Sequence, residues 1–224
     1  MEALRPLALL VCSVLPSVAG DLVGHAVITK HLTKKALAPV AYNLRGTALH
    51  SPQASEPVNE FDRLVVMLEG GSLPSKPPAT AVIDQRDARF DPEIVIVPVG
   101  SSIEFPNFDP IFHNVFSLSK TQPFDLGFYP KGQSRTVKFN RPGVVQVYCH
   151  IHANMYAAVV VTSSPWFAKP ATDGSFSWRD VPAGHYRLSA WHKIAGLYKT
   201  EVNVPESGSV DVTIQVPVDV EPRP

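Results

Sequence analysis

The sequence predicts an all-β fold, and three observations support this prediction. The chain of 224 residues contains 22 prolines, which break helices and suit loops and edge strands. Short segments rich in Val, Ile, Phe and Thr, the residues favoured in strands, recur along the chain. Turn signals containing Gly, Pro and Asp separate these segments at short intervals, which is typical of β-sandwiches.

The composition argues against binding to nucleic acid or to an anionic membrane. The chain carries 20 basic and 20 acidic side chains, so it has no net charge with which to attract nucleic acid or an anionic membrane. Its hydrophobic content of 45% is ordinary for a globular protein that buries a core. We therefore expect a globular protein with no nucleic-acid partner.

Residues 1–20 have the features of a secretory signal peptide. Arg5 supplies a positive charge, 7–15 is an apolar run too short to span a bilayer, and 17–20 offers small residues for cleavage. The alternative is a buried N-terminal strand. No later segment is long and apolar enough to be a membrane-spanning helix. We expect a periplasmic or secreted protein without a membrane span.

The two cysteines have different fates in this interpretation. Cys12 leaves with the signal peptide, so the mature chain keeps Cys149 alone and has no internal disulfide. A single thiol in an oxidising compartment is a liability unless something holds it. A bound metal would explain why Cys149 is present.

The mature chain divides at a Gly- and Pro-rich linker. Residues 21–75 form an N-terminal β segment with strands expected near 22–28 and 64–68 and irregular chain over 31–61. Two glycines and three prolines between residues 70 and 78 form the clearest boundary.

A continuous β unit follows over 79–163, and its strand spacing predicts a Greek-key sandwich. Residues 119–134, which include Pro123, Gly127 and Pro130, are expected to be a long loop. Residues 164–219 form a C-terminal β segment. The strands expected in these two stretches lie near 81–85, 94–97, 103–105, 112–118, 135–139, 144–149, 157–162, 176–178, 185–191, 198–204 and 210–216.

The segment 148–155 concentrates possible metal ligands. The spacing Cys149-x-x-His152-x-x-Met155 brings one thiolate, one imidazole and one thioether into one turn, and His113 follows an apolar segment upstream. Soft sulfur with imidazole is the ligand set that copper prefers, and two His, one Cys and a weak axial Met describe a blue-copper electron-transfer site. We predict that these four residues bind copper.

Two residues of the motif have an alternative role. Cys149 could be a buried structural thiol, and Met155 could be an ordinary core methionine. The regular spacing of Cys149, His152 and Met155 favours the interpretation that they are metal ligands. His150 follows Cys149 directly, so strand alternation should point it away from the metal. Asn114 is expected to bond the backbone of the ligand loop and brace it.

Residues 79–163 resemble the cupredoxins of plastocyanin and amicyanin type. The matching pieces are Phe90-Asp91-Pro92, residues 99–105, His113-Asn114-Val115 and Tyr148-Cys149-x-x-His152-x-x-Met155. The resemblance implies one mononuclear type 1 copper held by His113, Cys149 and His152, with Met155 as the axial ligand. His150 departs from the relatives, which commonly carry a small polar residue there.

The chain ends resemble a transthyretin-like, carboxypeptidase-regulatory-like β-sandwich. The pieces are residues 167–168, 172–176 and 181–188, with 23–27 and 64–68 filling the first two strands. The copper unit would then be inserted into a loop of this second sandwich. This arrangement is similar to that of periplasmic plastocyanin-like proteins of methylamine-utilisation type.

The expected function is carriage of single electrons between redox partner proteins. The first alternative is a periplasmic copper carrier or homeostasis protein that hands on the metal through the same ligands. The second is an enzyme domain, but related copper enzymes reach their catalytic copper through a His directly before the Cys, where this chain has Tyr148. The third is a binding module in which copper is incidental. We expect that the protein is not an enzyme.

Overall fold

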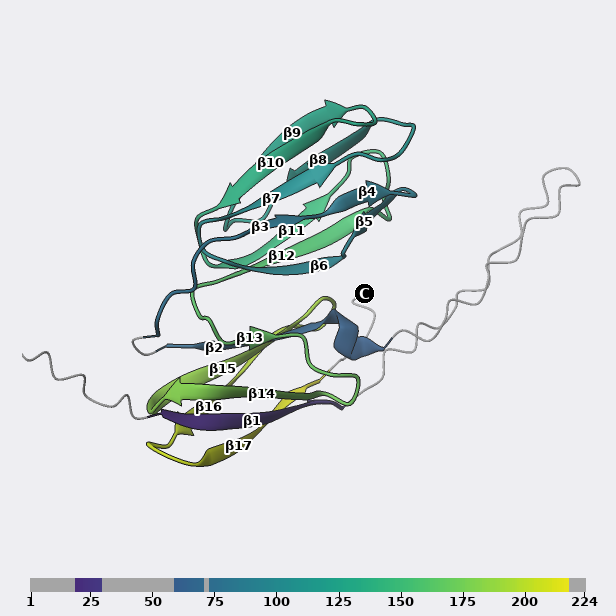
Figure 1. Ribbon diagram of the computed structural model, residues 1–224. Helices are drawn as coiled ribbons and strands as arrows, with labels where there is room; N and C mark the ends of the chain where they lie inside the picture. The colour runs from purple at the N-terminus through teal and green to yellow at the C-terminus, as the bar shows by residue number, and fades with distance from the viewer. Residues whose placement is uncertain (1–18, 30–58, 71–72, 218–224) are drawn as a thin grey trace, which may run out of the picture.

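The computed structural model describes residues 19–29, 59–70 and 73–217, and it is built almost entirely of β-strands in two lobes (Figure 1). The prediction of an all-β chain is confirmed. Over these ranges the regular structure other than strands is one 3-10 helix, η1 (Glu60–Arg63). No helix in the described part of the chain is long and apolar enough to cross a membrane.

The lower lobe in Figure 1 is a sandwich of two sheets made from both ends of the chain. One sheet has the order β14-β1-β17 and the other β13-β2-β15-β16. Their strands are β1 (Ala19–Ile28), β2 (Leu64–Glu69), β13 (Phe167–Ala168), β14 (Ser175–Pro182), β15 (Gly184–His192), β16 (Gly196–Val204) and β17 (Ser209–Val216).

The N-terminal strands are integral to this sandwich. Strand β1 runs parallel to β17 and antiparallel to β14, and β2 pairs with β13 and β15. Leu22 and Leu68 are fully buried in one cluster with Trp178 and Leu188 from the C-terminal segment. The two segments therefore share one hydrophobic core. Ala19 and Gly20, the last residues of the expected signal peptide, are the first two residues of β1.

The upper lobe is a second sandwich, made from the middle of the chain. Its sheets have the orders β10-β7-β3 and β6-β12-β11-β8-β9, and a separate hairpin joins β4 to β5. The strands are β3 (Thr80–Val82), β4 (Asp84–Arg86), β5 (Arg89–Asp91), β6 (Ile94–Pro98), β7 (Ser101–Pro106), β8 (His113–Ser117), β9 (Phe124–Tyr129), β10 (Ser134–Phe139), β11 (Gly143–Tyr148) and β12 (Tyr156–Thr162).

Strand β9 corrects the expectation of a long loop over 119–134. It pairs antiparallel with β8 and forms the edge of the five-stranded sheet. An edge strand tolerates the residues that suggested a loop, because one of its sides has no ladder to maintain. Gly127 lies inside the strand at φ 66°, next to the irregular pairing of β8 and β9. A glycine inside a strand marks such an irregularity as well as it marks a loop.

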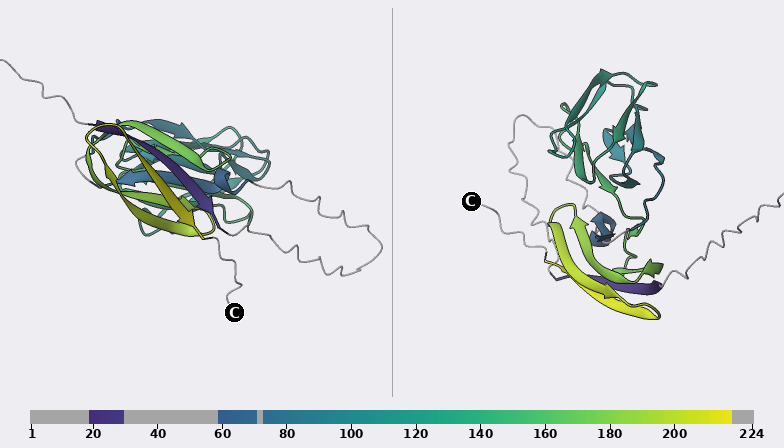
Figure 2. Two further views of the ribbon diagram at one scale, coloured as in Figure 1. Left: turned by 90° about the horizontal axis from the view of Figure 1, so that it is seen from below. Right: turned by 90° about the vertical axis from the view of Figure 1, so that its left-hand side faces the viewer.

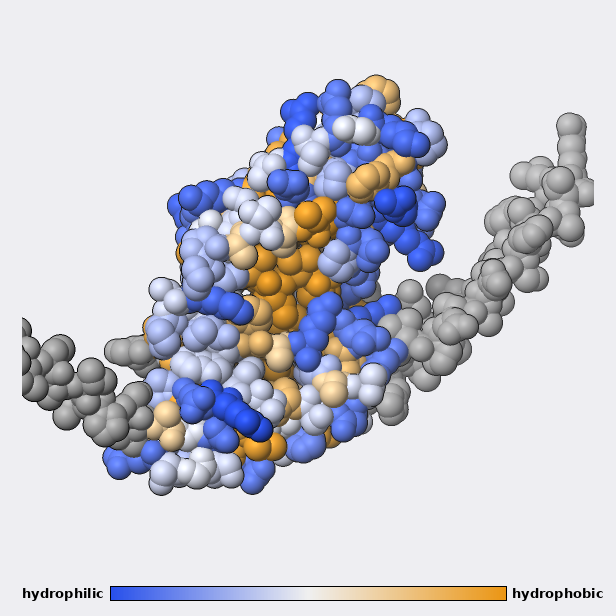
Figure 3. All heavy atoms as spheres, in the orientation of Figure 1, coloured by the Kyte–Doolittle hydropathy of each residue, from blue (hydrophilic) through white to orange (hydrophobic). Residues whose placement is uncertain are grey.

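The two sandwiches pack against each other through a third apolar cluster. Val65, Met67 and Trp191 of the lower lobe meet Ile94 and Val160 of the upper lobe, all 6% exposed or less. The molecule is therefore a stack of four sheets with a core in each of the three gaps. Figure 1 and the right-hand view of Figure 2 show the lobes one above the other. Figure 3 shows hydrophobic residues gathered over β6, β11 and β12, close to the junction between the lobes.

Candidate metal centre

Two strand ends and one loop of the upper lobe bring the predicted ligands together. His113 is the first residue of β8, Cys149 follows β11, His152 lies in the connecting loop, and Met155 directly precedes β12. The ligand atoms of His113, Cys149 and His152 all lie within 4.8 Å of one another. The fold thus brings His113 to two residues of the loop that lie more than 30 positions later in the sequence.

The neighbours of His113 distinguish its two ring nitrogens. Nε2 lies 2.7 Å from Oδ2 of Asp109, whereas Nδ1 is buried and has no hydrogen-bond partner. A carboxylate accepts hydrogen bonds, so Nε2–H donates to Asp109 and the proton is held at Nε2. The lone pair of Nδ1 is therefore free and directed into the protein. A buried imidazole nitrogen left in this state is a candidate metal ligand.

Asp109 is itself held by a tight hairpin turn. Its oxygens accept hydrogen bonds from the backbone N–H groups of Asp87 (2.7 Å) and Ala88 (2.9 Å). Both turn residues have positive φ, 54° and 52°, as in the two-residue turns that close hairpins. Burial acts to raise the pKa of Asp109, but the bonds from Ala88, His113 and Asp87 outweigh it and lower the pKa. The carboxylate is ionised and fixed.

The role of Asp109 was not predicted from the sequence. An acidic residue four positions before His113 was visible, but loop spacing alone does not show which atom it reaches. The two backbone N–H groups that hold it belong to another hairpin, about 20 residues away in the chain.

The ligand loop places Cys149 and His152 side by side. Sγ of Cys149 lies 3.8 Å from Nδ1 of His152, and the His113 and His152 ring centroids are 4.8 Å apart. Cys149 is 6% exposed, whereas His152 is partly exposed at the protein surface. The N–H of Met155 donates to the carbonyl of His152 at 3.0 Å, which closes the loop as a turn.

The donor set fits one metal ion. Two donors on opposite sides of a zinc-sized ion, each bound at about 2.0–2.3 Å, lie roughly 4.5 Å apart. The ligand atoms here, which all lie within 4.8 Å of one another, would have to move closer only slightly to share an ion. Met155 is fully buried in the same apolar cluster as Cys149. That position allows a thioether contact from within the protein. Two imidazole nitrogens and a cysteine sulfur beside it make a soft donor set of the kind that suits copper.

His150 points away from this cluster, as strand alternation predicts. Its ring stacks on Phe116 with centroids 3.8 Å apart and an interplanar angle of 9°, and Nε2 lies 3.5 Å from Oδ2 of Asp125. The expectation for Asn114 was wrong. Its amide donates to Oδ1 of Asp125 at 2.6 Å instead of to the ligand loop. Asn114 alternates with His113 along β8, so its side chain lies on the opposite face of the sheet, where it reaches Asp125.

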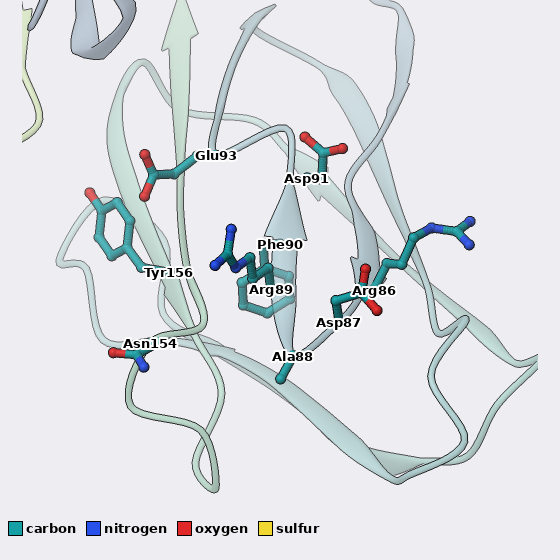
Figure 4. Close-up of a pocket in the computed structure, with 9 residues that line it drawn as sticks. All are labelled: Arg86, Asp87, Ala88, Arg89, Phe90, Asp91, Glu93, Asn154 and Tyr156. Carbon is teal, nitrogen blue, oxygen red and sulfur yellow. The ribbon is translucent and has the colours of Figure 1, made fainter. Parts of the chain in front are cut away.

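The surface next to the ligands is apolar on one side and hollowed on another. Ile111, Phe112 and Ile151, which neighbour His113 and His152 in the chain, are 45–56% exposed. A cleft of about 1000 Å³ opens between the β4–β5 hairpin and the end of the ligand loop, where Asn154 and Tyr156 line it (Figure 4).

Comparisons with known proteins give partial matches to solved structures. No protein-family model matches the chain, and no curated protein matches it. A Cu(I) amicyanin variant is 21% identical over 37% of this chain and 82% of its own, with a TM-score of 0.36. A reduced amicyanin variant at pH 4 is 19% identical over 43% of this chain and 98% of its own, also at 0.36.

A copper-containing nitrite reductase from Thermus scotoductus SA-01 is 20% identical over 43% of this chain. The match covers 25% of the reductase and has a TM-score of 0.36.

Proposed function

We propose that this chain is a periplasmic or secreted protein with one mononuclear type 1 copper and that it carries single electrons between redox partners. One observation supports the proposal above all: the convergence of His113, Cys149 and His152, with Nδ1 of His113 buried and unpartnered. A bound copper would supply a one-electron couple between Cu(I) and Cu(II). The residues around it would set the potential and keep the geometry constant.

The supporting residues favour a rigid site. Asp109 fixes the ring of His113 through a bond that is anchored in the β4–β5 turn. Cys149 and Met155 belong to the close-packed core between the two sheets of the upper lobe. A site that is held by packed side chains changes little when the charge on the metal changes, and a small rearrangement favours fast electron exchange.

The surface around His152 suits a redox partner. His152 is the partly exposed member of the cluster, so electrons would enter and leave through its imidazole edge. Phe108, Ile111, Phe112 and Ile151 expose 41–56% of their surface in the neighbouring segments. Exposed apolar residues at a functional site commonly form protein contacts. We propose that the partner docks on this surface.

Burial favours electron carriage over carriage of copper. His113 and Met155 are fully buried and Cys149 is 6% exposed, so an incoming protein ligand would reach only His152 directly. A protein that hands on its metal needs more of the ligand set within reach. We also propose that the chain is not an enzyme, since Tyr148, directly before Cys149, packs its ring between Phe116 and Tyr156 and supplies no metal ligand.

The visible spectrum of the Cu(II)-loaded protein tests the proposal. We expect an intense thiolate-to-copper band with one copper per chain, its loss in Cys149→Ser, and its retention in His150→Ala, the matched neighbour that stacks on Phe116. A wild-type protein without this band, or a Cys149→Ser variant that keeps it, would refute the type 1 site. Rapid loss of copper to a mild chelator would favour the carrier function instead.

A further inference from the structure

Strand β12 lies between two cores, one of which contains the ligand cluster. Ala157, Val159 and Val161 face the cluster that contains Cys149 and Met155. Ala158 and Val160 face the junction with the lower lobe and are 1% exposed or less. The strand that begins directly after Met155 is therefore covered by the second sandwich.

Both ends of the ligand loop enter an aromatic row on this covered face of the sheet. Tyr148, directly before Cys149, is paired in register with Phe116 of β8 on one side and with Tyr156 of β12 on the other. The ring centroids are 5.9 Å apart for Phe116 and Tyr148, and 5.4 Å apart for Tyr148 and Tyr156. His150 stacks on Phe116 and extends the row. Aromatic pairs at these spacings attract one another.

The lower lobe contributes a cation at the other end of the row. Nζ of Lys193 lies 4.4 Å from the ring centroid of Tyr156 and pairs with the carboxylate of Glu93. The backbone carbonyl of Glu93 accepts the N–H of Ala158 at 2.8 Å. Figure 4 shows the Glu93 and Tyr156 side chains on the same side of the cleft. Lys193 thus contacts β12 directly at Tyr156 and is connected to it a second time through Glu93.

The backbone of Lys193 is also held in place. Its N–H donates to the carbonyl of Arg63 at 3.0 Å. The turn after it is closed by the N–H groups of Ile194 and Ala195, which both donate to Nδ1 of His192. Holding the backbone fixes the point from which the lysine side chain extends, so only the rotamers of the side chain itself remain to be ordered when the ammonium group makes the contact.

We propose that Lys193 is a positioning residue for the metal-ligand loop: it holds the Tyr156 end of the aromatic row, and the second sandwich thereby restrains residues 149–155. The relevance of this restraint to copper rests on the proposed function, whereas the restraint itself is a property of the chain without metal. General adhesion between the lobes is supplied by the apolar cluster of Val65, Met67 and Trp191 against β6 and β12. Removing one cation should therefore loosen the loop without separating the lobes.

The test is backbone hydrogen exchange in the full-length, metal-free protein. We expect Lys193→Met to speed exchange in residues 150–156 about fivefold, the loss that corresponds to a cation–π contact plus a partly exposed ion pair of about 1 kcal/mol in total. Exchange in β1, β14 and β17 should not change. Lys193→Arg keeps a cation over the ring and should restore slow exchange. Glu93→Gln removes only the ion pair and should give a smaller effect in the same segment.

Lys199→Met is the matched control. Lys199 pairs with Glu69 at 3.5 Å within the same sandwich and lies in β16, away from the aromatic row. Equal loop exchange in Lys193→Met and Lys199→Met, or no rescue by Lys193→Arg, would overturn the proposal. In the Cu(II)-loaded protein, Lys193→Met should also shift the visible band, and Lys193→Arg should reverse the shift.

The two proposals fail separately. If hydrogen exchange in the loop depends on Lys193 but the protein has no thiolate-to-copper band, the proposed restraint stands and the proposed copper site is rejected. A normal band with loop exchange that is indifferent to Lys193 would preserve the copper site and reject the restraint.

Discussion

His113 has two ring nitrogens, and its neighbours give them different tasks. Nε2 is 2.7 Å from the ionised carboxylate of Asp109, while Nδ1 has no partner. A carboxylate on the far side of a ligating imidazole fixes the tautomer and makes the imidazole a stronger donor. Asp109 therefore determines which ring nitrogen His113 offers to a ligand.

Replacing Asp109 with Asn should weaken the site without removing it. The single amide oxygen cannot accept from Asp87, Ala88 and His113 together, so the imidazole loses its fixed orientation. We expect copper affinity to fall about 10–100-fold and the reduction potential to rise, as measured by metal titration and voltammetry. Asp173→Asn, a similar change at an exposed turn of the other sandwich, should have no effect. An unchanged potential in Asp109→Asn would contradict the assigned role.

Met155 should tune the site more than it holds it. The side chain is fully buried beside Cys149, so Leu fills nearly the same volume and the fold should persist. Loss of the thioether favours Cu(I), and a tenfold shift in its favour corresponds to a rise of about 59 mV in potential. We expect Met155→Leu to keep one copper per chain and to raise the potential by at least that amount in voltammetry. Complete loss of copper would show that Met155 is a strong ligand.

At the scale of elements, the features that local sequence patterns determine could be predicted, whereas contacts between distant segments could not. The ligand loop and most strands could be read from spacing, because alternation and turn residues are local signals. Strand β9 could not, since an edge strand with an internal glycine has the composition of a loop. Asp109 and Lys193 could not either, because Asp109 is held by backbone N–H groups of a distant hairpin and Lys193 contacts a ring that is distant in the chain. The unbroken apolar run of β12 did carry a signal for burial on both faces.

The turn from β15 to β16 depends on a neutral histidine. His192 is fully buried, and its Nδ1 accepts two backbone N–H groups, which leaves the proton on Nε2, 3.2 Å from Glu60. Burial lowers the pKa of His192, Arg63 adds to this, and Glu60 opposes it without reversing the direction. The unfolded chain therefore takes up a proton at higher pH than the folded chain does.

Stability should accordingly fall as the pH drops below about 6.5, the ordinary value for histidine. Between this value and the lowered pKa, one extra proton on the unfolded chain costs at most about 1.4 kcal/mol of unfolding free energy per pH unit. His192→Asn keeps an acceptor for the turn and cannot titrate. We expect urea unfolding between pH 7 and 5 to show a flatter dependence in this variant than in the wild type. Identical slopes would mean that other groups cause the dependence.

At the scale of the whole molecule, the junction between the lobes leaves the upper lobe incomplete by itself. Residues 79–163 contain both sheets around the ligands, but Ile94, Ala158 and Val160 are covered by the lower lobe. Alternate residues of β12 therefore pack in different cores. Val159 faces the ligand-bearing core, and Val160 faces the other sandwich.

This difference predicts that one substitution has opposite effects in the isolated upper lobe and in the full chain. Expressed alone, 79–163 should bind copper but self-associate through the exposed apolar face, and Val160→Lys should make the fragment monomeric in sedimentation experiments. In the full chain the same substitution buries an unpaired charge and should cost about 3 kcal/mol or more of unfolding free energy. Val159→Lys, one residue earlier, should prevent folding in both contexts. A fragment that is already monomeric without the substitution would contradict this prediction. A full chain that tolerates Val160→Lys would contradict it as well, because a lysine charge can enter the junction only if the junction opens to water. Either result would show that the lobes are joined only by their linkers.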